Sequence, residues 1–138
     1  VWMGAIANGG KAAVPYYAER TVDFLGIPHS LHHSAKTDRL VSADTAARLT
    51  ELMANNVDVS YGASRFPNMD LCAKSGTAER ENGPADAMFA GFVQDEAYPL
   101  AFVVFAEQGG SGSQIAAPIA AKVLTACKTM LNTPNPNS

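Results

Sequence analysis

The chain has 138 residues, of which 47% are hydrophobic and 17% are charged, a composition typical of a globular domain and not of a disordered segment. Its formal net charge is −3 and its lysines and arginines do not cluster, which argues against a nucleic-acid-binding protein. The longest apolar run, residues 100–106, is much shorter than the roughly 20 residues that a membrane-spanning helix needs.

The first ten residues are typical of the end of an apolar helix. Residues 1–7 are mostly apolar, and the Asn-Gly-Gly at 8–10 is a common helix stop. The chain opens neither with an initiator methionine nor with the charged and apolar regions of a signal peptide. We therefore expect other residues of the same fold to precede Val1.

Residues 12–22 contain β-branched and aromatic residues and predict a strand or an extended segment. The polar stretch 26–39 predicts a loop that carries three histidines. Their spacing fits no common zinc pattern, so we favour a solvated loop over a metal site. The histidines concerned are His29, His32 and His33.

A helix is predicted to follow, with Ser42 as its N-cap and Asp44 at the positive end of its dipole. Apolar residues at helical spacing continue to the Ala-Asn-Asn at 54–56, which closes it. Residues 57–68 contain Gly62 and Pro67 and are expected to be irregular.

Three strands are predicted next, at residues 69–78, 87–93 and 100–106. The short polar connection 94–99 makes the second and third strands an antiparallel hairpin. Because the third strand is apolar at every position, we expect it to be covered on both faces.

The Gly-rich residues 109–113 lack the spacing of a phosphate-binding loop and predict a tight turn into a final helix with Ser113 as its N-cap. The order of elements indicates an α+β fold, an antiparallel sheet with helices packed on it. Residues 132–138 are expected to form a flexible tail. The apolar stripe predicted to pack on the sheet comprises Ile115, Ile119, Val123, Ala126 and Met130.

Two cysteines, Cys72 and Cys127, allow either two free buried thiols or one disulfide. A disulfide would require the final helix to lie against the strand that holds Cys72. The two alternatives stay open.

The most unusual stretch is Lys-Ser-Gly-Thr at residues 74–77, since a buried strand rarely contains an unpaired lysine. The hydroxyls of Ser75 and Thr77 could both donate to one carboxylate, and Gly76 would let a ligand backbone approach the strand. Strand alternation places Lys74 on the opposite face, so a single cleft could use all three side chains only if the strand twists strongly.

The segment AKSGTAE at 73–79 resembles the third motif of penicillin-binding proteins and β-lactamases. Three other segments resemble the same family in order and spacing: MGAIANGGKAAVPYY, DAMFAGFV and FVVFAEQGGSGSQIAAPIAAKVL. The chain is similar to the C-terminal half of a class B penicillin-binding protein transpeptidase domain, which would span residues 1–131. The fold would then be three strands of the larger sheet of that domain.

The resemblance implies a role for each residue of the strand. Lys74 would keep the field beside a catalytic serine positive, and the Thr77 N–H would be half of an oxyanion hole. The hydroxyls of Ser75 and Thr77 would hold the carboxylate of a substrate or a β-lactam. Gly76 and Ala78 would belong to the edge on which the substrate peptide lies. The family implies neither a cofactor nor a metal.

The other two motifs of the family are absent from this sequence, which contains neither Ser-x-x-Lys nor Ser-x-Asn. The chain alone is therefore expected to be inactive, and its partner would be the remainder of the transpeptidase domain that carries the serine. The resemblance further implies stem peptides ending in D-Ala-D-Ala and β-lactams as ligands, no nucleic acid, and an extracytoplasmic location with the parent protein anchored to the membrane by a segment outside this chain.

Two other functions stay open on the sequence. A β-lactamase or β-lactam sensor domain uses a similar third motif, although class D-type enzymes usually show Lys-Thr-Gly before a Trp-rich strand, unlike residues 87–92. A non-catalytic interaction module would keep the fold without the chemistry.

Overall fold

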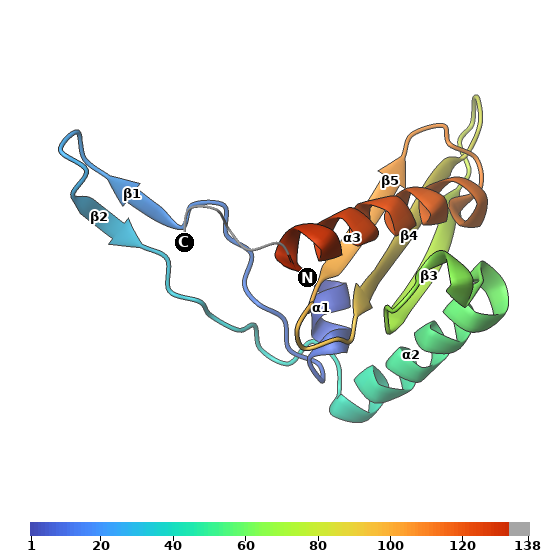
Figure 1. Cartoon of the computed structure of the whole chain (residues 1–138), viewed down its shortest axis with the longest axis horizontal. Coiled ribbons are helices and arrows are strands. Elements are labelled where there is room, and N and C mark those ends of the chain that lie inside the picture. The colour runs from blue at the N-terminus through green and yellow to red at the C-terminus, as the bar shows by residue number, and fades with distance from the viewer. Residues whose placement is uncertain (133–138) are drawn as a thin grey trace. The chain divides into compact units, whose positions relative to one another are not determined.

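The computed structural model describes residues 1–132 and confirms the α+β fold, with helices and two antiparallel sheets (Figure 1). The helices are α1 (Trp2–Ala7), α2 (Ala43–Asn56) and α3 (Ala117–Asn132). The strands are β1 (Arg20–Val22), β2 (Pro28–Leu31), β3 (Leu71–Ala78), β4 (Asp86–Val93) and β5 (Ala101–Ala106). The chain divides into two compact units, Val1–Ala47 and the residues from Arg48 onward.

The first unit begins with α1, which ends at the predicted glycine stop because Gly9 and Gly10 both adopt positive φ. An antiparallel ribbon follows, in which Ala13 bridges Lys36 and β1 pairs with β2. The prediction of a loop over 26–39 is therefore wrong for β2. Its polar, histidine-containing sequence gave no strand signal, and the pairing comes from the turn that Asp23 stabilises by accepting hydrogen bonds from two backbone N–H groups.

Helix α2 begins where its sequence predicts. The Ser42 hydroxyl accepts a hydrogen bond from the Thr45 N–H at 3.0 Å, as an N-cap residue does for the third helical residue. The irregular segment predicted after this helix contains a π-helical turn, Val57–Tyr61, and a 3₁₀ turn, Ala63–Arg65.

The second unit is built on a three-stranded sheet in the order β3-β4-β5, with both pairs antiparallel. All three predicted strands are present within two residues of their predicted bounds. The register places Ser75 opposite Phe89 and Thr77 opposite Ala87. Strand β3 is an edge of this sheet, and the Lys-Ser-Gly-Thr stretch lies in its second half.

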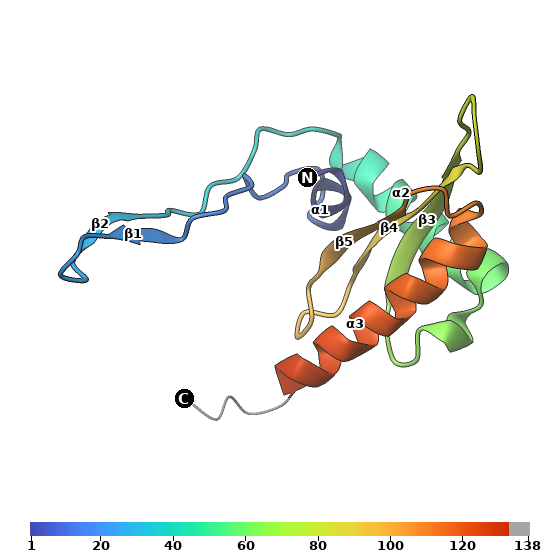
Figure 2. The same ribbon diagram turned by 90° about the horizontal axis from the view of Figure 1, so that it is seen from above.

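One face of the sheet carries the core, and α3 lies along it in both views (Figures 1 and 2). Phe89 is fully buried at the centre of this core. Its ring meets Tyr61 edge-on at 5.0 Å between centroids and stacks on Phe66 at 5.9 Å. These contacts join the helical turns after α2 to the sheet.

The prediction that β5 is covered on both faces is wrong within the described residues. Phe102, Val104 and Ala106 pack against the core, whereas Val103 and Phe105 are 65% and 55% exposed. An apolar sequence at every position favours burial of both faces of a strand, but it does not supply the element that covers the second face.

The final helix packs on the sheet through small residues and not through the predicted stripe. A π-helical turn, Gly112–Ala116, precedes α3. Its N-cap is Ser111, two residues before the predicted Ser113. The buried face comprises Ala116, Ala117, Ala120 and Leu124, whereas Ile115, Ile119, Val123 and Met130 are exposed. Alanines let the helix backbone approach the sheet closely, and this requirement outweighs the size of the apolar side chains.

The two cysteines are free. Cys127 packs against the core on the α3 face, whereas Cys72 alternates to the other face of β3, where its thiol donates to the Gln94 side-chain oxygen at 3.1 Å. Burial, with a contribution from Asp70, raises the pKa of the Cys72 thiol to about 11. The opposite faces explain why these two thiols do not meet.

The predicted tail, residues 132–138, lies outside the described residues except for Asn132, which ends α3. No helix within residues 1–132 combines the length and the apolar character that a membrane crossing requires.

The burial of Phe89 predicts how much its substitution lowers the stability of the fold. Phe89→Ala removes a fully buried ring from the centre of the core, and we expect it to lower the free energy of unfolding by about 3–5 kcal/mol. Phe24→Ala is the matched control, because Phe24 is 94% exposed and its loss should change stability by no more than about 0.5 kcal/mol. Urea denaturation followed by circular dichroism measures both values. Equal effects of the two substitutions would contradict the central role of Phe89.

Candidate functional site

The candidate site is the open edge of β3 around Ser75 and Thr77. In an antiparallel strand the backbone groups of alternate residues point to the neighbouring strand and away from it. The Ser75 N–H points away from β4, because it donates a hydrogen bond to the Tyr61 hydroxyl at 2.9 Å. The Thr77 N–H, two residues further on, therefore points to the same open edge.

Lys74 reaches this edge from the other face of the sheet. Its ammonium group donates to the Ser75 carbonyl oxygen at 2.8 Å, and this carbonyl also points to the open edge. The strong strand twist that alternation had required is thus unnecessary, because the long lysine side chain bends over the edge. The charge of Lys74 is thus brought to the edge that carries the Ser75 backbone groups and the Thr77 N–H.

The Ser75 side chain is half-buried and has a partner that the sequence did not reveal. The Tyr61 hydroxyl donates to the Ser75 hydroxyl oxygen at 3.1 Å while it accepts from the Ser75 N–H. Tyr61 lies in the π-helical turn after α2 and is itself buried. Nothing in the spacing of residues 61 and 75 indicates this contact, since it depends on how the turn packs on the sheet.

The Thr77 hydroxyl accepts a hydrogen bond from the Gly112 N–H at 3.3 Å. Gly112 opens the turn before α3, and its backbone lies directly on the paired residues Gly76 and Met88. Any side chain at position 112 would overlap the carbonyl oxygens of both paired residues. The Gly-rich sequence predicted a tight turn, but its contact with Thr77 becomes visible only in the structure.

The remaining residues of the predicted site complete the edge. Gly76 is half-buried, and a Cβ atom there would lie 3.3 Å from the Met88 Cβ, which is a close but tolerable contact. Ala78 is exposed at the end of β3, opposite Asp86. All five residues from Lys74 to Ala78 therefore belong to one continuous edge strand.

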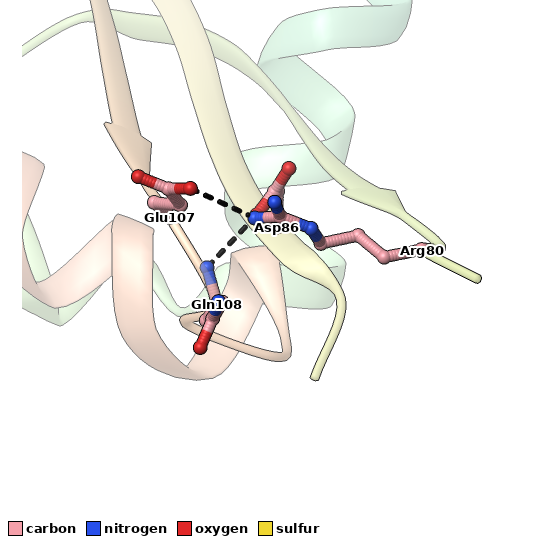
Figure 3. Close-up of polar contacts among 4 residues, drawn as sticks. All are labelled: Arg80, Asp86, Glu107 and Gln108. Atoms are coloured by element: carbon pink, nitrogen blue, oxygen red, sulfur yellow. Dashed lines mark hydrogen bonds and ion pairs between the residues drawn. The ribbon is translucent and has the colours of Figure 1, made fainter. Parts of the chain in front are cut away.

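An ion cluster links the residues just after β3 to the start of β4 and to the end of β5 (Figure 3). The Arg80 guanidinium lies 3.0 Å from the carboxylates of both Asp86 and Glu107, and Asp86 also accepts a hydrogen bond from the Gln108 N–H at 2.8 Å. The Gln108 hydrogen bond and Arg80 lower the pKa of the Asp86 carboxyl. The contacts with Glu107 and Asp86 raise the pKa of Arg80.

This cluster determines where the turn before α3 begins. Asp86 and Arg80 hold residues 107 and 108, and the Gly110 N–H donates to the Ala85 carbonyl at 2.7 Å. The turn is therefore tied to the start of β4 immediately before Gly112 reaches Thr77. The sequence did not reveal this cluster, because Arg80 and Glu107 lie 27 positions apart.

The predicted loop histidines lie elsewhere, in the first unit. The His29 Nε2 atom lies 3.9 Å from the Asp23 carboxylate, and the His32 ring stacks on Tyr16 with 3.5 Å between ring centroids. Among residues 1–132, no three metal-ligating side chains of the His, Cys, Asp and Glu types come together.

Residues 2–125 match the family model of the penicillin binding protein transpeptidase domain. Peptidoglycan D,D-transpeptidase PbpA of Mycobacterium tuberculosis H37Rv is 31% identical to this chain over 132 residues, which cover 88% of the chain. PbpA of Mycolicibacterium smegmatis is 30% identical over the same length. The chain spans about a quarter of these curated relatives, 26% of each.

Solved structures of penicillin-binding proteins and D,D-transpeptidase domains are also similar to this chain. Penicillin-binding protein A of M. tuberculosis, as a ceftriaxone acyl-enzyme complex, superposes with a TM-score of 0.78 at 31% identity, covering 88% of this chain and 29% of that one. The D,D-transpeptidase domain of a peptidoglycan glycosyltransferase from Eggerthella lenta superposes with a TM-score of 0.78 at 29% identity, covering 93% of this chain and 30% of that one.

The lowered pKa of Asp86 predicts how stability depends on pH. A carboxyl whose pKa is depressed by folding stabilises the fold above its ordinary pKa of about 3.9, and this contribution disappears as the pH falls through the folded-state pKa. We expect Asp86→Asn to lower the melting temperature at pH 7, with the difference from the wild type vanishing in acid. Glu96→Gln removes an exposed charge at a hairpin tip and is the control. A difference for Asp86→Asn that stays constant between pH 7 and pH 2 would contradict this account.

Proposed function

Because the chain belongs to the penicillin-binding protein transpeptidase family, we propose that it supplies one wall of the active site of a peptidoglycan D,D-transpeptidase. The observation that carries the proposal is the convergence of Lys74, Ser75 and Thr77 at the open edge of β3. An edge strand with a cation and two hydroxyls is suited to bind an extended peptide that ends in a carboxylate.

We assign the carboxylate of the ligand to the Ser75 and Thr77 hydroxyls, with the Lys74 ammonium keeping the field positive. The ligand would be a stem peptide ending in D-Ala-D-Ala or a β-lactam, which is what the acyl-enzyme complex of the M. tuberculosis relative contains in the case of ceftriaxone. Gly76 and Ala78 would extend the edge along which the peptide backbone lies.

The Thr77 N–H is the proposed donor of the oxyanion hole. It points to the open edge beside the carboxylate-binding hydroxyls, where the carbonyl of an extended ligand would pair with the strand. A fixed backbone donor stabilises the charge that develops on this oxygen during acyl transfer, and loss of one such donor typically costs about 10²–10³ in rate.

The nucleophile would come from the remainder of the transpeptidase domain, because this sequence contains no Ser-x-x-Lys. In the proposed reaction that serine attacks the penultimate D-Ala carbonyl, the terminal D-Ala leaves with a proton, and an amine of a second stem peptide accepts the acyl group and restores the serine. The chemistry proceeds through a serine ester and uses no cofactor.

Two apolar surfaces of the second unit support the existence of such a partner segment. Strand β5 has an open edge, and Val103 and Phe105 are exposed on its uncovered face. Helix α3 and the π-helical turn before it also expose a stripe of apolar side chains, namely Ile115, Ile119, Val123 and Met130. An open strand edge with large apolar neighbours is typical of a surface that another segment covers.

The proposed substrate also implies a location. Peptidoglycan is assembled outside the cytoplasmic membrane, so we place the domain in an extracytoplasmic compartment, with the parent protein anchored to the membrane by a segment that is not in this chain.

Labelling with a fluorescent penicillin tests the source of the nucleophile. We expect covalent labelling of the full-length protein and none of this 138-residue chain, because the acylated serine belongs to the remainder of the domain. Denaturing gel electrophoresis before and after competition with unlabelled penicillin measures the covalent adduct. Specific labelling of the isolated chain would contradict the assignment.

The role of Thr77 is tested in the full-length protein. Thr77→Val removes a hydroxyl that we assign to the ligand carboxylate, and a hydrogen bond to a charged group contributes about 1.5–3 kcal/mol, so acylation by a penicillin should slow by about 10–100-fold. Thr77→Ser is the matched control, because it keeps the hydroxyl that accepts from Gly112. Stopped-flow acylation rates and melting temperatures separate loss of binding from loss of folding. An unchanged acylation rate in Thr77→Val would overturn the assignment.

A further inference from the structure

We propose that Tyr61 is a positioning residue for the ligand carboxylate, acting through Ser75. This inference rests on the proposed function, since it concerns the hydroxyl that we assign to the carboxylate. The two residues are 14 positions apart and are joined by two hydrogen bonds through a single tyrosine oxygen.

The direction of these bonds determines what Ser75 can do. The Tyr61 hydroxyl has one proton, which it donates to the Ser75 hydroxyl oxygen at 3.1 Å, and its oxygen accepts the Ser75 N–H at 2.9 Å. The hydroxyl proton of Ser75 is then not used in this pair. It can be donated to a carboxylate, and its direction is restricted because Tyr61 occupies a lone pair of the Ser75 oxygen.

The tyrosine is itself held in place by the core. Its side chain is 6% exposed, and its ring meets the fully buried Phe89 edge-on with 5.0 Å between centroids. Phe89 lies on β4 directly opposite Ser75. The Tyr61 oxygen is therefore presented to Ser75 from a closed aromatic cluster, which reduces the motion of the serine side chain before a ligand binds.

The same contact limits where a ligand backbone can pair with β3. At Ser75 the N–H is taken by Tyr61 and the carbonyl by Lys74. The next residue whose backbone points to the open edge is Thr77. Tyr61 therefore sets the position along the edge at which a bound peptide begins to pair.

The test compares two ligands that differ only in the carboxylate. Second-order acylation rates of the full-length protein are measured with benzylpenicillin and with its methyl ester, and their ratio reports recognition of the carboxylate. Tyr61→Phe removes one oxygen and keeps the ring against Phe89. We expect it to slow acylation by benzylpenicillin about fivefold, as loss of a hydrogen bond of average strength does, and by the ester less than about twofold.

Tyr98→Phe is the matched control outside the site. Tyr98 is also buried, and its hydroxyl donates to the Leu124 carbonyl in α3 at 2.6 Å. Loss of this oxygen should lower the melting temperature without changing the ratio of the two rates. If Tyr61 had only a structural role, Tyr61→Phe would behave like Tyr98→Phe. It would then slow acylation by both ligands equally and leave the ratio of the two rates unchanged, and that result would overturn the inference.

Ser75→Ala separates this inference from the proposed function. If Ser75→Ala lowers the ratio and Tyr61→Phe does not, Ser75 binds the carboxylate without help and the role of Tyr61 is refuted. If Ser75→Ala leaves the ratio unchanged, the assignment of Ser75 fails and the inference fails with it. The expected result is that both single variants lower the ratio and that the double variant lowers it no further than Ser75→Ala alone.

Discussion

The unpaired edge of β3 is the feature around which the other contacts of the second unit are arranged. An edge strand must leave backbone groups available to a ligand, yet unpaired groups invite pairing with any other chain. Here Tyr61 and Lys74 satisfy the N–H and the carbonyl of Ser75, which leaves Thr77 as the next residue that faces the edge. The backbone groups that stay open for pairing thus begin at Thr77.

The contacts around this edge hold it without covering it. Gly112 brings backbone against β3 and β4 from the core face and donates to the Thr77 hydroxyl, which only a residue without a side chain allows. The cluster of Arg80, Asp86 and Glu107 fastens the turn that delivers Gly112. The alanine face of α3 continues this close approach along the sheet. The Thr77 side chain is therefore positioned by segments that lie far from it in the sequence.

Features that depend on residues close together in the sequence were predicted correctly, whereas features that depend on tertiary packing were not. The three strands of the sheet and the cap at Ser42 were predicted because alternation, turn residues and capping are local. Strand β2 was missed because its residues have no strand signal and pair only through the hairpin. The stripe on α3 was assigned to the wrong face, since helical spacing identifies which residues share a face but not which of two apolar faces meets the sheet.

By itself the sequence determined the residue types of the candidate site, their place on one strand and the family of the chain, because a short motif and its spacing can be read along the chain. Only the tertiary structure decided that Lys74 reaches the same edge as Ser75, that Tyr61 holds Ser75 and that Gly112 holds Thr77. These contacts join residues up to 35 positions apart. Packing of helical turns on the sheet creates them, and no local pattern encodes that packing.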